Sequence, residues 1–78
     1  MKDKNIASLA SLIRRNWKSV YFGAVPYLDA MSSMDSINDA YGFDSGKSIV
    51  RYFLANASSF RGPVAKEIKA ELNARLKA

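Results

Sequence analysis

The sequence predicts an all-α fold, a compact single-domain bundle of four to five helices without strands. Three observations support this prediction. Apolar residues recur at helical spacing in several segments, no segment has the pattern of a strand, and glycine or proline residues separate the helical segments. With 78 residues and no internal repeat, the chain has the length of one domain with one core, residues 1–78.

The first helix is expected from Asp3 to about Lys18. Asp3 suits its N-cap or first turn, and Arg14 and Arg15 suit its last turn, because these charges complement the helix dipole. The apolar residues repeat at i, i+3, i+4, i+7 and i+11 and therefore share one face: Ile6, Leu9, Ala10, Ile13 and Trp17.

Two shorter helical segments are expected next. Pro26 suits the first turn of a helix that runs to about Ser32, because a missing N–H costs nothing there. A serine-rich break follows, and a restarted helix is expected over residues 34–41. Gly42 would end that helix in the left-handed conformation, and Phe43 is expected to pack into the junction.

The central helix is expected from Gly46 to about Ala57, capped by Asp44 or Ser45. Gly46 is a weak helix former that is tolerable at a helix end. Apolar residues cover a wide face of this segment, which predicts neighbours on more than one side. They are Ile49, Val50, Tyr52, Phe53, Leu54, Ala55, Ala57 and Phe60.

The last helix is expected from Pro63 to about Leu76. Gly62 supplies the turn before it, and Pro63 suits the first helical position. Glu71 and Arg75 form an i, i+4 pair in the favourable orientation. Its inward face is expected to consist of Val64, Ile68, Leu72 and Leu76, with Ala65 and Ala74 beside them.

The amino-acid composition excludes several classes of function. The chain has no cysteine and no histidine, so disulfides, thiolate metal sites and the commonest general base are excluded, and we expect no cofactor and no metal. No two acid–base side chains form an obvious pair, so we do not expect an enzyme. The longest uncharged run, residues 19–28, is too short for a membrane span and the first residues are polar. We therefore expect a cytoplasmic protein without a secretory signal or membrane association.

Three short motifs resemble known binding or modification sites in part of their sequence, but each lacks a feature that the site requires. Gly46-Lys47-Ser48 lacks the glycine that a phosphate-binding loop needs five residues earlier, where Tyr41 stands. The acidic residues from Asp35 onward lack the ligand spacing of a calcium loop. Asn56-Ala57-Ser58 matches the consensus of an N-glycosylation site. We do not expect it to be glycosylated, because it lies in an expected helical segment and we expect no signal peptide.

The first hypothesis for function is a non-enzymatic protein-binding module. The net charge is +5, and aromatic and basic residues gather at the end of the first helix. Exposed aromatic rings beside arginine are typical of binding hot spots. The candidate partner-binding residues are Arg14, Arg15, Trp17, Lys18 and Tyr21.

The alternative is a helical nucleic-acid-binding protein with a helix-turn-helix-like arrangement over residues 34–53. Its second helix would begin with polar and basic residues, as a recognition helix does, although Asp35, Asp39 and Asp44 disfavour phosphate contacts. The candidate nucleic-acid-binding residues are Lys47, Arg51, Lys66 and Lys69. A third hypothesis is self-association through the apolar central helix, and the sequence leaves monomer and homodimer open.

Three segments resemble small uncharacterised bacteriophage proteins: residues 20–28, 52–62 and 69–73. Together they cover about a third of the chain and contain no motif tied to chemistry. The resemblance implies a non-structural phage accessory protein, made early in infection, that binds and inhibits a host factor or a defence system. It implies an action in the host cytoplasm and transfers no functional residues.

Overall fold

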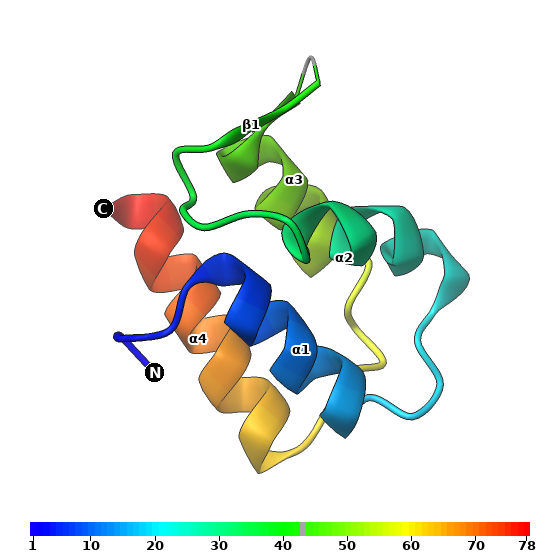
Figure 1. Ribbon diagram of the computed structural model, residues 1–78. Coiled ribbons are helices and arrows are strands. Elements are labelled where there is room, and N and C mark those ends of the chain that lie inside the picture. The colour runs from blue at the N-terminus through cyan, green and yellow to red at the C-terminus, as the bar shows by residue number, and fades with distance from the viewer. Residues whose placement is uncertain (43) are drawn as a thin grey trace.

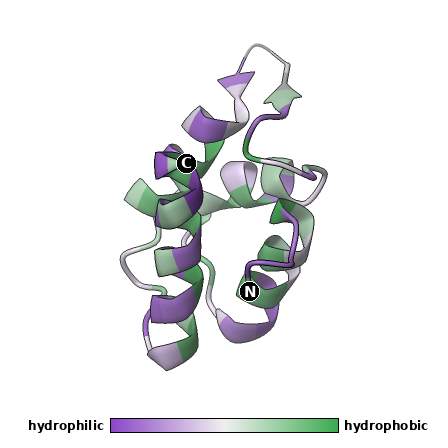
Figure 2. Cartoon of the chain, turned by 90° about the vertical axis from the view of Figure 1, so that its left-hand side faces the viewer, coloured by the Kyte–Doolittle hydropathy of each residue, from purple (hydrophilic) through white to green (hydrophobic). Residues whose placement is uncertain are grey.

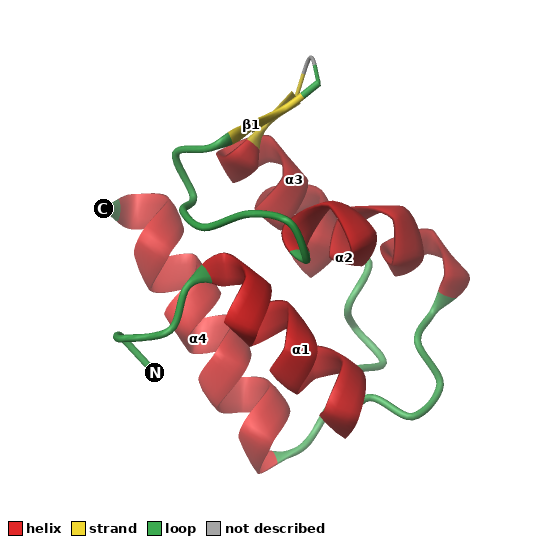
Figure 3. Ribbon diagram, in the orientation of Figure 1, coloured by secondary structure: helices red, strands yellow, loops and turns green. Residues whose placement is uncertain are grey.

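The computed structural model describes residues 1–42 and 44–78, so the packing expected for Phe43 lies outside the described residues. Four α-helices, one short 3₁₀ helix and a two-stranded hairpin make up the described fold (Figure 3). In chain order they are α1 (Ile6–Asn16), η1 (Phe22–Ala24), α2 (Val25–Met31), β1 (Ala40–Tyr41), β2 (Asp44–Ser45), α3 (Gly46–Ala55) and α4 (Pro63–Lys77). The fold is therefore mostly α-helical, as predicted.

The four α-helices surround one core. Helix α1 contacts α2 and α4, and α3 also contacts α2 and α4, so each helix packs against two others. Helices α1 and α4 lie side by side and run roughly antiparallel, which brings the end of α1 to the beginning of α4 (Figure 1). Each helix carries both hydrophobic and hydrophilic residues, as amphipathic helices do (Figure 2). Among the described residues no polar or charged side chain is buried.

Helix α1 begins later than the sequence predicted. Its N-cap is Asn5, whose side-chain oxygen accepts a hydrogen bond from the Ser8 N–H at 2.8 Å, whereas Asp3 lies outside the helix. The Asn5 side chain also donates to Asp35 Oδ1 at 3.1 Å, which connects this helix end to the 32–39 segment. The predicted inward face of α1 is confirmed: Ile6, Leu9, Ala10, Ile13 and Trp17 are all buried.

The prediction of a helix over residues 34–41 is wrong. The carbonyls of Met34 and Asp35 accept hydrogen bonds from the N–H groups of Ala7 (2.8 Å) and Ile6 (3.2 Å). These N–H groups belong to the first turn of α1, where no intrahelical partner exists. The 34–39 segment thus caps α1 by its backbone, and the Asp39 side chain accepts from the Asp35 N–H at 2.8 Å.

The prediction that the chain has no strands is also wrong. Strands β1 and β2 pair antiparallel, with Ala40 opposite Ser45 and Tyr41 opposite Asp44. Gly42 has the left-handed φ of +64° that the sequence predicted, but it lies in the hairpin and not at a helix end. Residues 34–42 contain no helix, so within the described part of residues 34–53 the helix-turn-helix arrangement is not formed.

Helix α3 begins where the sequence predicted. Ser45 is its N-cap and accepts from the Ser48 N–H at 3.1 Å. Gly46 is more constrained than expected: its N–H donates to the Asp39 carbonyl at 2.6 Å, and a Cβ atom there would lie 2.6 Å from the Ile37 carbonyl oxygen. Glycine is required because the 37–39 backbone passes directly over the start of the helix. The helix ends at Ala55, two residues earlier than expected.

Helix α4 begins at Pro63 after Gly62, whose φ is +111°, as the sequence predicted. The Glu71–Arg75 ion pair forms at 2.8 Å. The predicted inward face is confirmed at Ala65, Ile68 and Leu72, which are buried, but it is wrong at Val64, which is 40% exposed. The helix is thus rotated so that its smaller alanine faces the core, and Ala74 is exposed as well.

Candidate binding surface

Trp17 lies in the core. Its side chain is 5% exposed, and its ring stacks on Phe60 with the ring centroids 5.2 Å apart and the planes 23° apart. The same ring meets Phe53 edge to face at a centroid distance of 6.2 Å. A buried ring offers no area to a partner, so we do not retain Trp17 among the candidate contact residues.

Tyr21 and Phe22 lie on the surface just after Trp17. Phe22 is 80% exposed and Tyr21 is 46% exposed, and their ring centroids are 4.8 Å apart. Gly23 allows this arrangement, because a Cβ atom at that position would lie 2.6 Å from Tyr21 Cε2 and 2.9 Å from the Asn56 side-chain oxygen. The backbone at Gly23 therefore lies close to both the Tyr21 ring and Asn56, the C-cap residue of α3.

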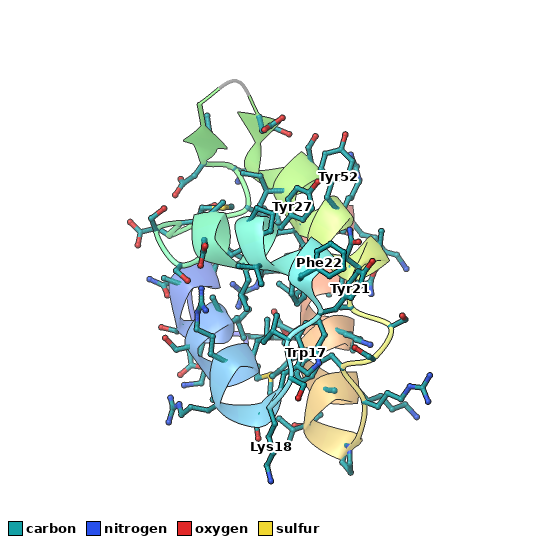
Figure 4. The ribbon with its side chains drawn as sticks, turned by 90° about the vertical axis from the view of Figure 1, so that its right-hand side faces the viewer. Trp17, Lys18, Tyr21, Phe22, Tyr27 and Tyr52 are labelled. Atoms are coloured by element: carbon teal, nitrogen blue, oxygen red, sulfur yellow. The ribbon has the colours of Figure 1, made fainter. Side chains whose placement is uncertain are left out.

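A second aromatic pair joins α2 to α3. Tyr27 of α2 is half-buried and Tyr52 of α3 is 50% exposed, and their ring centroids are 5.4 Å apart. Figure 4 shows both pairs on the same side of the molecule. We call these four residues, Tyr21, Phe22, Tyr27 and Tyr52, the aromatic stripe. The sequence indicated only Tyr21, because the second pair forms between residues on different helices.

The predicted basic residues near the stripe differ in their availability. Arg14 forms an ion pair with Asp29, so its charge is partly neutralised. Arg15 and Lys18 are exposed and form no ion pair within the described part of the chain. Lys18 lies beyond Trp17, at the end of the molecule where α4 begins (Figure 4). Two cations without an ion pair thus precede the aromatic stripe in the chain, six and three residues before Tyr21.

The four candidate nucleic-acid-binding residues do not gather at one place. Lys66 and Lys69 line one groove beside Arg61, at the start of α4. Lys47 belongs to the first turn of α3, which lies at the hairpin end of the molecule, opposite the start of α4 (Figure 1). Arg51 is exposed in the middle of α3. The basic residues of α3 and those of α4 therefore form separate basic surfaces.

The described residues show neither a metal centre nor a membrane-spanning segment. No group of three or more acidic side chains in residues 1–42 and 44–78 is placed to hold a metal ion. None of the helices in the same residues is both long enough and apolar enough to cross a membrane. Comparison of the chain with protein-family models, curated protein sequences and solved structures finds no significant match, so the function has to be argued from the surfaces themselves.

Proposed function

We propose that this chain is a non-enzymatic binding module that docks on an acidic surface of a partner protein through the aromatic stripe. The observation that carries the proposal is the exposure of Phe22, which leaves a large apolar ring in water beside Tyr21. Aromatic residues supply much of the binding energy at protein interfaces, because their rings bury a large area at a small loss of conformational entropy.

The rings of the stripe are pre-organised. Tyr21 packs against Phe22 and lies close to Gly23, and Tyr52 packs against Tyr27, so each exposed ring has a neighbour that limits its movement. Little order has to be imposed when a partner binds, which favours affinity. This arrangement favours the interpretation that the stripe is a binding surface. It disfavours the interpretation that the rings are exposed by chance.

Charge supports an acidic partner. The chain has a net charge of +5, and Arg15 and Lys18 are free cations in the segment that leads to the stripe. Complementary charge accelerates encounter and selects the partner more than it raises the final affinity. In the phage context that the sequence resembles, we propose that the partner is a host factor or a component of a defence complex in the host cytoplasm.

Paired variants test this proposal. Phe22→Ser removes the exposed ring, and Val64→Ser, which changes a 40% exposed apolar residue on α4, is the matched control. We expect a host protein that the wild-type and Val64→Ser proteins capture, and that Phe22→Ser loses, with about 30-fold or greater weakening when the purified pair is titrated. Equal capture by all three proteins would refute the proposal. Concentration-dependent dimerisation that Phe22→Ser abolishes would show that the stripe binds a second copy of this chain.

Nucleic-acid binding is the second candidate function, and the groove shared by Lys66 and Lys69 is the observation that favours it. Mobility of mixed-sequence DNA measured at about 50 and 200 mM salt tests it, because phosphate contacts weaken steeply with salt. A shift at low salt that Lys66→Gln and Lys69→Gln abolish would support this function. No shift at either salt would exclude it.

A further inference from the structure

A groove lies between the end of the 56–62 segment and the first turns of α4. Its volume is about 610 Å³, and it is lined by Phe60, Arg61, Gly62, Pro63, Lys66 and Lys69. The exposed lining is mostly apolar, and it includes three cationic residues, Arg61, Lys66 and Lys69. We infer that this groove binds an acidic peptide segment that carries an apolar side chain. The inference rests on the proposed function, since the partner protein would supply this segment.

The floor of the groove is rigid. Phe60 is buried and stacked on Trp17, and Pro63 begins α4 directly after Gly62. Nothing lies within 4 Å of the position that a Cβ atom of Gly62 would occupy, so this residue leaves the groove open. Because Phe60 is 1% exposed, the apolar surface open to a ligand comes from Pro63 and from the aliphatic parts of the three cationic side chains, and it suits an aliphatic or aromatic side chain.

The rim of the groove is positive and unneutralised. Arg61, Lys66 and Lys69 form no ion pair within the described residues, and no acidic residue lines the groove. Burial, together with the neighbouring Arg61 charge, lowers the pKa of Lys69. A carboxylate in the groove would relieve this repulsion, so charge complementarity selects an acidic ligand.

The groove suits a peptide better than a nucleic acid. Single-stranded nucleic acids bind through bases that stack on open aromatic faces. One face of Phe60 is stacked on Trp17, and Lys69 Nζ lies over the ring at 5.7 Å from its centroid. No open ring is available there, whereas the apolar floor would be left unused by phosphates alone.

A second hollow adjoins the groove. Its lining includes Trp17, Lys18 and Ser19 at the end of α1 and Ser59, Phe60 and Arg61 before α4. Phe60 and Arg61 thus belong to both depressions, and Lys18 adds a fourth cation beside the groove. An extended acidic segment that fills both depressions would therefore meet four cations.

The direct test is an NMR titration of the ¹⁵N-labelled full chain with a synthetic glutamate-rich peptide that contains one leucine. We expect the largest shifts at residues 60–69. Peptides with glutamine for glutamate, or serine for leucine, should bind more weakly. The double variant Lys66→Gln/Lys69→Gln should weaken binding about four- to ninefold, since each exposed charge contributes a factor of about two to three. The charge-matched control Lys2→Gln/Lys77→Gln should weaken it less than twofold.

Three outcomes would overturn the inference. They are an absence of shifts at residues 60–69, an equal loss of affinity in the charge-matched control, and tighter binding of a single-stranded oligonucleotide than of the peptide at the same salt concentration.

The Phe22→Ser variant separates this inference from the proposed function. If that variant binds the peptide normally but captures the partner as wild type does, the groove stands and the stripe proposal fails. If the peptide does not bind while Phe22→Ser loses the partner, the stripe stands and the groove inference fails.

Discussion

Replacing Trp17 by alanine would test the assignment of this residue to the core. Truncation of a buried tryptophan costs about 3–5 kcal/mol, because contacts are lost and a cavity remains. Trp17 is 5% exposed and makes two aromatic contacts, with Phe53 and Phe60, so we expect a cost of about 4 kcal/mol. A domain of 78 residues has a total free energy of unfolding of about 4–12 kcal/mol, so this one change removes a third or more of it.

The measurement is urea and thermal unfolding followed by far-UV circular dichroism, which does not depend on tryptophan fluorescence. We expect Trp17→Ala to lower the melting temperature by about 15–30 °C, at about 4–8 °C for each kcal/mol. Phe22→Ala is the control, and because its ring is 80% exposed it should change the free energy of unfolding by less than about 0.5 kcal/mol. A cost below about 1 kcal/mol for Trp17→Ala would refute the packing of this ring and return Trp17 to the candidate contact residues.

Three further predictions concern α3 and α4. Gly46→Ala should destabilise the fold by about 1–3 kcal/mol despite the better helix propensity of alanine, because its Cβ would lie 2.6 Å from the Ile37 carbonyl oxygen; an increase in urea midpoint would contradict this. Ser45→Ala should cost about 1 kcal/mol and Ser45→Asp much less, since aspartate also accepts from the Ser48 N–H; equal losses would exclude the cap. The pKa of Lys69 is lowered in the folded state, so the unfolded chain binds more protons just below pH 10.5. The free energy of unfolding of the wild type should therefore rise relative to that of Lys69→Gln as the pH rises toward 10.5. A fall over this range would contradict the lowered pKa of Lys69.

The sequence predicted the parts of the fold that depend on local signals. Helices α1, α3 and α4 have apolar residues at helical spacing, and each begins beside a residue with a distinct backbone role, such as Ser45 or Gly62. These signals involve neighbours within a few positions. The starts of α3 and α4 and the buried face of α1 could therefore be predicted without knowledge of the rest of the chain, whereas the start of α1 at Asn5 and the exposure of Val64 could not.

The 34–41 segment was mispredicted because its conformation depends on a distant helix. Its residues are compatible with a helix, but the carbonyls of Met34 and Asp35 accept hydrogen bonds from α1 N–H groups that lie 27 and 29 positions earlier in the chain. Buried Met34 and Ile37 anchor the same segment in the core. Tertiary contacts thus override a weak local preference.

The candidate surfaces were predictable in composition but not in arrangement. The aromatic and basic cluster at residues 14–22 is visible in the sequence, but which ring is exposed is decided by Phe53 and Phe60, which enclose Trp17. The Tyr27–Tyr52 pair requires α2 and α3 to meet. Arg61 was interpreted only as part of a turn, and its place beside Lys66 and Lys69 follows from the path of the chain into α4.

Trp17 links the two proposed surfaces, and this limits how binding data on its variants can be interpreted. Its ring supports Phe60, which is the floor of the groove, and its backbone begins the segment that leads to Tyr21 and Phe22. A cavity at Trp17 would therefore disturb the groove and the stripe together without either surface losing a contact residue. Loss of binding in Trp17→Ala would measure damage to the core, whereas Phe22 and Lys66, which are exposed, can be changed without creating a cavity. Variants at these two residues separate the contribution of each surface from the stability of the fold.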